Sequence, residues 1–172
     1  MKKWWPFGKN DSNKKDEALF LEQETELRQR FDDALANGHP RQQLLYQIEQ
    51  ESVKLEREAE TAVNKAKLRA YDLLYSEIRP SMLANLTNGK NFEMAGQVDD
   101  AIRCYQAAID DQVSTRFPYE HLRVIYRQRQ QEDQALNVCQ AALKNPYLSE
   151  KDRAHFQNWS EKIEAFLGAS AA

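Results

Sequence analysis

Apolar residues recur along most of this chain at the three- and four-residue spacing of an α-helix. In the first part of the chain they are Leu19, Phe20, Leu27, Phe31 and Leu35. This spacing predicts a helix over residues 16–37, and the glycine and proline of "NGHP" at residues 37–40 predict its end. No segment alternates apolar and polar residues as a half-buried strand does, so the pattern predicts an all-α protein.

Residues 41–79 contain neither glycine nor proline, which predicts one long helix ended by Pro80. Its apolar and small positions follow a heptad-like seam: Leu45, Ile48, Ser52, Leu55, Ala59, Ala62 and Ala66. Two packings suit such a seam. We favour an antiparallel hairpin with the helix over residues 16–37, and the alternative is a homodimeric coiled coil.

After Pro80 the pattern predicts shorter helices over residues 81–95, 98–111, 116–130, 132–145 and 149–167. Two of these segments, "DDAIRCYQAAID" and "EDQALNVCQAALKN", resemble each other at a constant offset of 34 residues. The matched pairs are Phe92 and Tyr126, Ala101 and Ala135, Ile102 and Leu136, Ala107 and Ala141, Ala108 and Ala142, and Ile109 and Leu143. Self-similarity at this period predicts stacked helical hairpins, with the small residues where helices cross.

The pattern resembles the tetratricopeptide repeat (TPR), and the resemblance covers residues 82–149. The matching positions are Gly89, Phe92, Gly96, Ala101, Tyr105 and Ala108 in the first copy, and Tyr119, Leu122, Tyr126, Ala135, Cys139, Ala142 and Pro146 in the second. The departures are Asn85, Asn88, Arg123 and Gln130, which stand where the family has Trp, Leu, Gly and Gly.

The resemblance implies two TPR-like hairpins that follow an N-terminal helical hairpin with a long helix. Two repeats need covers at both ends. The apolar side of a C-terminal capping helix supplies one cover, through Phe156, Trp159, Ile163, Phe166 and Leu167. Tyr71, Leu74, Tyr75 and Ile78 of the long helix supply the other. We therefore expect a flexible tail over residues 1–15, a hairpin over residues 16–79 and a TPR-like domain over residues 80–168.

Stacked hairpins of this family leave a concave face that binds a peptide or helix. The family's groove positions fall on Leu83, Leu86, Lys90, Glu93, Met94, Phe117, Glu120, Val124, Arg127 and Gln128. Lys151, Ala154, His155 and Asn158 of the terminal helix complete the wall. The alternative is that the N-terminal helix fills this groove itself.

Some members of the family grip a terminal carboxylate at fixed groove positions. The corresponding residues here are Leu86, Lys90, His121, Lys151 and His155, and only Lys151 agrees in type. We therefore do not expect a chaperone-tail clamp. The resemblance implies instead a protein–protein interaction adaptor for an unidentified protein or peptide. The alternative is a structural or tethering protein that dimerises through the helix over residues 41–79 and contacts the membrane surface through its N-terminal tail.

The net charge of −3 conceals an asymmetry, because residues 1–15 carry five lysines and one aspartate and so leave −7 for the rest. An acidic chain without a clustered positive surface predicts no nucleic-acid partner. The N-terminal residues Lys2, Lys3, Trp4, Trp5, Phe7 and Lys9 combine interfacial aromatic side chains with cationic ones. They suit weak contact with an anionic membrane surface. The alternative is that the tryptophans dock on the protein body or on a partner.

Cys104 and Cys139 lie within the apolar pattern of predicted helices and do not have the spacing of metal ligands, so we expect free, buried thiols. Free thiols indicate a reducing compartment. We therefore expect a cytoplasmic protein whose only membrane contact is at the membrane surface. The segment after "MKKWW" lacks the central apolar region of a signal peptide, and no apolar run is long enough to cross a bilayer. His39, His121 and His155 have no Ser, Cys or carboxylate at a spacing typical of a dyad, and neither a phosphate loop nor a metal loop occurs. We expect no enzyme activity, cofactor or metal.

Overall fold

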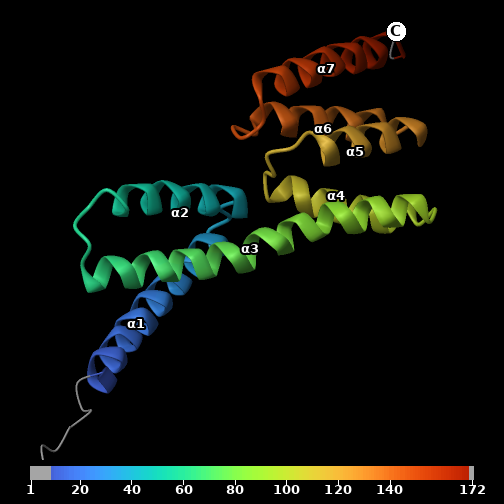
Figure 1. Cartoon of the computed structure of the whole chain (residues 1–172). Helices are drawn as coiled ribbons and strands as arrows, with labels where there is room; N and C mark the ends of the chain where they lie inside the picture. The colour runs from blue at the N-terminus through green and yellow to red at the C-terminus, as the bar shows by residue number, and fades with distance from the viewer. Residues whose placement is uncertain (1–8, 171–172) are drawn as a thin grey trace, which may run out of the picture. The chain divides into compact units, whose positions relative to one another are not determined.

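The computed structural model describes the backbone of residues 9–170 and the side chains of residues 13–170. This part of the chain is helical and contains no strand, which confirms the all-α prediction (Figure 1). The helices are α1 (Lys9–Ala36), α2 (Arg41–Leu55), α3 (Ala62–Met94), α4 (Val98–Asp110), α5 (Phe117–Gln128), α6 (Glu132–Lys144) and α7 (Glu150–Ser170). They form two compact units, Met1–Arg79 and Pro80–Ala172.

The predicted long helix over residues 41–79 is wrong, because α2 ends at Leu55 and α3 begins only at Ala62. Every side chain over residues 56–63 is exposed, so this stretch of the heptad-like seam buries nothing. Thr61 starts the new helix, because the backbone N–H of Asn64 donates to its Oγ1 at 3.1 Å as in an N-cap. The uninterrupted seam that a coiled coil over residues 41–79 requires is therefore absent.

The prediction that Pro80 ends a helix is also wrong, because Pro80 lies inside α3. A proline removes one backbone hydrogen bond from a helix interior and crowds the preceding turn. Pro80 and the residues on either side of it are exposed, so the carbonyl that loses its partner can bind water instead. The helix continues because Met82, two residues after Pro80, is buried. Helix α1 also differs from the prediction, since it begins at Lys9 instead of Asp16 and includes half of the expected tail.

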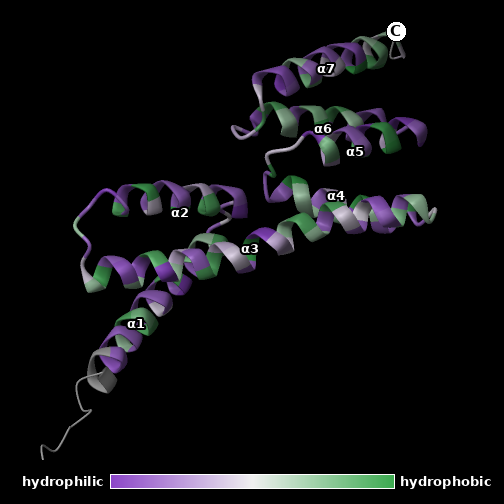
Figure 2. Ribbon diagram, viewed as in Figure 1, coloured by the Kyte–Doolittle hydropathy of each residue, from purple (hydrophilic) through white to green (hydrophobic). Residues whose placement is uncertain are grey.

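In Met1–Arg79, α1 runs alongside the first part of α3 in the same direction. Glu17 pairs with Arg69 at 3.0 Å, and Arg28 further along α1 pairs with Glu77 at 2.9 Å. The buried apolar residues of this unit come from α1, α2 and α3: Phe20, Leu27, Phe31, Leu44, Leu45, Ile48, Ala66, Ala70, Tyr71, Leu74 and Ile78. Figure 2 shows these helices with apolar residues interspersed among polar ones.

In Pro80–Ala172, each helix from α4 onward packs on the next, α4 on α5, α5 on α6 and α6 on α7. The alanines predicted at helix crossings, Ala101 and Ala135, are completely buried, as are Ala108 and Ala142. Side chains of one methyl group let helix backbones approach closely. The buried register predicted from the two copies is therefore correct at these positions.

The two copies exchange large and small residues at one contact. A Cβ atom on Gly89 would lie 2.5 Å from the ring of Tyr105, so any larger residue requires the ring to shift. At the matching positions, 34 residues later, Arg123 replaces the glycine and Cys139 replaces the tyrosine. Arg123 and Cys139 are both buried, and the Arg123 charge opposes the larger effect of burial on the pKa of the Cys139 thiol. In the first copy the large side chain of the pair, Tyr105, belongs to the second helix of the hairpin, α4. In the second copy the large side chain, Arg123, belongs to the first helix, α5.

Candidate functional site

Two histidine–glutamate pairs join three helices that are not consecutive. His121 Nδ1 of α5 lies 2.7 Å from Glu93 Oε2 of α3, and His155 Nε2 of α7 lies 2.9 Å from Glu120 Oε2 of α5. The four side chains are each about one-third exposed. The pairs align α3, α5 and α7 along one side of the unit, which we call the α3–α5–α7 face.

The first pair belongs to an aromatic cluster. The Tyr105 hydroxyl donates to the same Glu93 oxygen at 2.8 Å, and the Phe117 ring lies 4.1 Å from the His121 ring between centroids. Burial, followed by the contact with Glu93, raises the pKa of Tyr105 well above its ordinary value. Tyr105 therefore stays protonated and donates its hydrogen bond to the carboxylate.

The second pair includes a buried cation. The Arg123 side chain is almost wholly buried and hydrogen-bonds the Glu120 carboxylate. Burial alone would raise the pKa of Glu120, but hydrogen bonds from Arg123 and His155 outweigh it and lower the pKa. Glu120 is therefore ionised and compensates the buried guanidinium, which would otherwise be costly.

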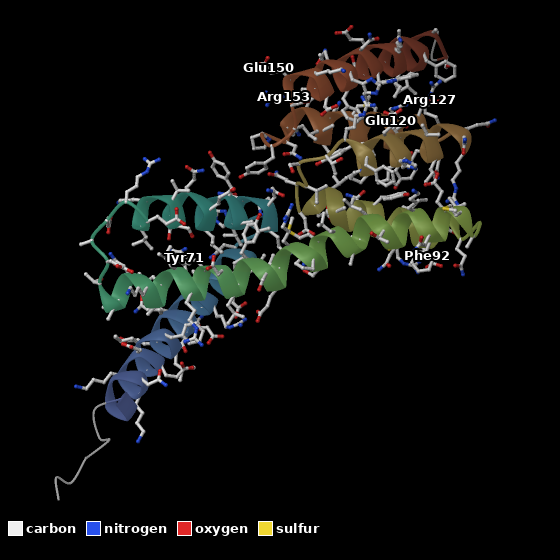
Figure 3. The ribbon with its side chains drawn as sticks, in the orientation of Figure 1. Tyr71, Phe92, Glu120, Arg127, Glu150 and Arg153 are labelled. Atoms are coloured by element: carbon white, nitrogen blue, oxygen red, sulfur yellow. The ribbon has the colours of Figure 1, made fainter. Side chains whose placement is uncertain are left out.

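One indole ring of α7 lies under three cationic side chains. The Arg123 guanidinium carbon lies 3.8 Å from the centroid of the Trp159 ring, the Arg127 guanidinium carbon 5.5 Å, and Lys162 Nζ 5.0 Å. Arg127 also pairs with Glu132 at 3.1 Å. These cation–π contacts fix the orientation of α7 against α5. Figure 3 labels Glu120 and Arg127 on α5.

The ten groove residues predicted from the sequence divide into three groups. Leu83, Lys90, Met94 and Gln128 are exposed; Leu86, Phe117 and Val124 are half-buried; and Glu93, Glu120 and Arg127 are half-buried and bonded within the protein. Leu83 and Met94 are 45% and 78% exposed, which makes them the accessible apolar side chains of the set. Of the predicted wall, Lys151, Ala154 and Asn158 are exposed, and His155 bonds Glu120.

The charges of the α3–α5–α7 face are unequally satisfied. Both carboxylates, Glu93 and Glu120, accept hydrogen bonds from neighbouring helices. Lys90 and Lys151 form no ion pair with any described residue. The face therefore retains free cationic donors and exposed apolar groups, while its anions are already occupied.

Sequence reasoning missed the roles of Tyr105, His121, Arg123 and Trp159 in this face. The predictions treated Tyr105 as core, Trp159 as part of a capping surface and His121 as isolated. The signal was present in the repeat, because His121 and His155 are also 34 residues apart. Their partners could not be found from local spacing, since Glu93 and Glu120 lie 28 and 35 residues away in sequence.

The proposed membrane-contact residues Lys2, Lys3, Trp4, Trp5 and Phe7 lie outside the described residues, as does the side chain of Lys9. Within residues 9–170, no helix is both long and apolar enough to traverse a bilayer. Among the described side chains, no three His, Cys, Asp or Glu residues gather as metal ligands would. Cys104 and Cys139 are free thiols; Cys139 is buried as predicted, but Cys104 is only half-buried. Burial raises the pKa of Cys139 to about 11.

Comparison with known proteins gave no match to any protein-family model, curated protein or solved structure. The resemblance to the tetratricopeptide repeat therefore remains one of residue pattern.

Proposed function

We propose that this protein is a non-catalytic adaptor that binds a peptide or a helix of a partner protein through the α3–α5–α7 face. The observation that carries the proposal is the pair of histidine–glutamate bonds, which hold three helices side by side. Leu83 and Met94 are exposed apolar side chains of α3, and the groove positions of the repeat pattern assign them to this face.

The face has the properties of a pre-organised binding surface. Its polar groups are fixed by bonds within the protein, so a partner pays little to order them. Positions 83, 86, 90 and 94 share one side of α3, because their spacing follows the helical repeat. A partner helix or extended segment can therefore place its apolar side chains along this row, with acidic groups near Lys90 and Lys151.

Two exposed apolar residues provide the test. The double variant Leu83→Gln and Met94→Gln removes apolar contact without opening a buried core, because both side chains are accessible. Removing two such contacts should weaken partner binding about tenfold or more. The matched control is Phe166→Gln on α7, which is also 52% exposed but was not among the predicted groove positions.

The measurement is affinity capture with quantitative mass spectrometry, comparing wild type, the double variant and the control. We expect a set of proteins that the wild type and the Phe166→Gln control retain and the double variant loses, with unchanged helical circular dichroism. Identical captured proteins for all three forms would contradict the use of this face.

We also propose that the protein works in the reducing cytoplasm. Both cysteines are free thiols, and Cys139 is completely buried, so it cannot form a disulfide without unfolding.

A further inference from the structure

The first unit contains an open pocket that is separate from the α3–α5–α7 face. It has a volume of about 310 Å³ and lies between α2 and the part of α3 that belongs to Met1–Arg79. Its floor is formed by Ile48 and Tyr71, which are buried, and by Tyr75, which is half-buried. Figure 3 shows Tyr71 between α2 and α3. We call this pocket the α2–α3 groove.

The rim of the α2–α3 groove is acidic. Glu49, Glu56 and Asp72 line it, and no lysine or arginine does. None of these three carboxylates forms an ion pair with a described residue. The neighbouring Glu51 differs, because Arg30 pairs with it at 3.1 Å and the Tyr71 hydroxyl donates to it at 2.5 Å. The groove therefore concentrates uncompensated negative charge above an apolar and aromatic floor.

This combination selects the chemistry of an occupant. A suitable segment carries lysine or arginine for the rim and aromatic or large apolar side chains for the floor. Val53, which also lines the groove, is 40% exposed and offers further apolar contact. A chain of acidic or purely polar character would be repelled or would leave the floor uncovered.

The chain itself contains a segment with this chemistry. Residues 1–8 read "MKKWWPFG" and combine two lysines with two tryptophans and a phenylalanine. They lie outside the described part of the structure and immediately precede α1. We propose that the N-terminal segment of a second copy docks in the α2–α3 groove, so that two copies exchange segments and form a homodimer.

The second copy is favoured over the same chain by the position of α1. Helix α1 contacts α3 through Arg69 and Glu77, and no α1 residue lines the groove. Eight residues extend at most about 27 Å, and the segment of the same chain must spend part of this length passing around the α2–α3 pair. A second copy has no such restriction. Reciprocal exchange also gives two docked segments per dimer, as expected for a two-fold interface.

The test compares charge-neutralising variants of the full chain. Glu49→Gln, Glu56→Gln and Asp72→Asn together remove the charge of the rim. The matched control, Glu22→Gln, Asp32→Asn and Asp133→Asn, removes the same charge from exposed residues that do not line the groove. A third variant, Trp4→Ser and Trp5→Ser, alters the proposed occupant.

The measurement is sedimentation velocity from about 1 µM to about 200 µM protein, a range that covers a micromolar dissociation constant. We expect the wild type and the control to dimerise as concentration rises. The groove and tryptophan variants should dimerise at least tenfold more weakly, and dimerisation should weaken with added salt. A monomer throughout the range, or a dimer unaffected by the groove variant, would overturn the proposal.

Fluorine NMR distinguishes docking of the N-terminal segment of a second copy from the other possible fates of this segment. In protein labelled with 5-fluorotryptophan, the ¹⁹F signals of Trp4 and Trp5 should become protected from solvent as the dimer forms. Protection in a monomer, sensitive to the groove variant, would place the segment of the same chain there and overturn exchange. Binding of residues 1–8 to anionic phosphatidylserine vesicles, in protein that forms no dimer, would also overturn the exchange. Leu83→Gln and Met94→Gln should leave dimerisation unchanged, so this proposal and the adaptor proposal can fail independently.

Discussion

The two units of this protein have interiors of different character. In Pro80–Ala172, Tyr105, Tyr119, Leu122 and Phe156 are completely buried, together with the four crossing alanines. In Met1–Arg79, the lowest described exposures are 1% at Ala70 and 3% at Ile48. This unit also has more large apolar side chains at the surface, among them Leu21, Leu35, Tyr46, Val53 and Val63.

The difference shows how side-chain size controls burial in a small helical unit. Alternating alanine and aromatic residues let helices in the second unit approach closely around large rings. The first unit has fewer small residues at its contacts, so parts of its apolar surface stay accessible. We therefore expect the second unit to be the more stable one and the first to open at lower free energy.

Each unit also contains a polar side chain that bonds several partners, Asn145 in the second and Glu51 in the first, and we call these two residues polar hubs. Asn145 is 1% exposed, donates to the Val113 carbonyl at 3.0 Å and to the Tyr119 hydroxyl at 2.8 Å, and accepts from the Tyr147 N–H at 2.8 Å. Glu51 in the first unit bonds Arg30 and Tyr71, but its side chain is 40% exposed. Water can replace the partners of Glu51, whereas the bonds of Asn145 to Val113 and Tyr119 are buried.

The largest expected effect comes from removing these hubs. Asn145→Ala removes the partner of two buried groups, the Val113 carbonyl and the Tyr119 hydroxyl, and should lower the free energy of opening of α5 and α6 by about 3 kcal/mol. Glu51→Ala should lower that of α2 by about 1 kcal/mol or less, because its bonds are solvent-accessible. Native-state hydrogen exchange measures both units separately. Equal losses at the two hubs would contradict the difference in burial.

A smaller effect is expected at high pH. Burial raises the pKa of Tyr119 to about 12 despite the opposing bond from Asn145, and burial with the Glu51 bond raises the pKa of Tyr71 to about 12. Because the folded pKa lies above the ordinary value of 10.0, stability is intact below pH 10 and declines as pH rises toward 12. Tyr119 should contribute a loss of about 2 kcal/mol, and Tyr71 should contribute less, because its hydroxyl bonds the solvent-accessible Glu51.

The second unit should lose more over this range, because the pKa of Tyr105 is also raised there. Hydrogen exchange rates, corrected for intrinsic pH dependence, and tyrosinate absorbance check this prediction. Tyr119→Phe should reduce the alkaline loss in the second unit alone, and Tyr71→Phe that in the first. A loss that neither substitution changes would assign the alkaline response to other groups.

The smallest effect tests the close packing of α3 on α4. Gly89→Ala places a methyl group against the Tyr105 ring and should cost about 1 kcal/mol, because overpacking exceeds the gain in helix propensity. Gly168→Ala on α7 has open space around it and should be neutral or slightly stabilising. Urea unfolding followed by circular dichroism compares the two. A stabilised Gly89→Ala variant would show that the Tyr105 ring moves away freely.

The sequence predicted the second unit better than the first, for a physical reason. In the second unit the periodic residues are buried, so the observed helices α4 and α6 match the predicted ones within one residue. In the first, Ala59 and Ala62 continue the heptad-like seam but are exposed, and the helix breaks there. The periodic pattern indicates which residues can be buried, but the packing of the helices determines whether they are buried.

The candidate site was predicted only in part. The groove positions fall on α3 and α5, but three of them, Glu93, Glu120 and Arg127, are bonded to side chains of other helices. The departures from the repeat pattern were also informative. Gln130, where the family has glycine, adopts φ of 59°, close to the 75° of the matching Gly96, so the turn keeps its left-handed conformation without glycine.

The exchange of Gly89 and Tyr105 for Arg123 and Cys139 limits how this array could be lengthened by protein engineering. A tyrosine-bearing helix set beside an arginine-bearing one would bring two bulky side chains into a space that holds one, whereas cysteine beside glycine would leave a void. An added module would therefore have to be transplanted with both of its helices, and shuffling single helices between the copies should yield misfolded chimaeras.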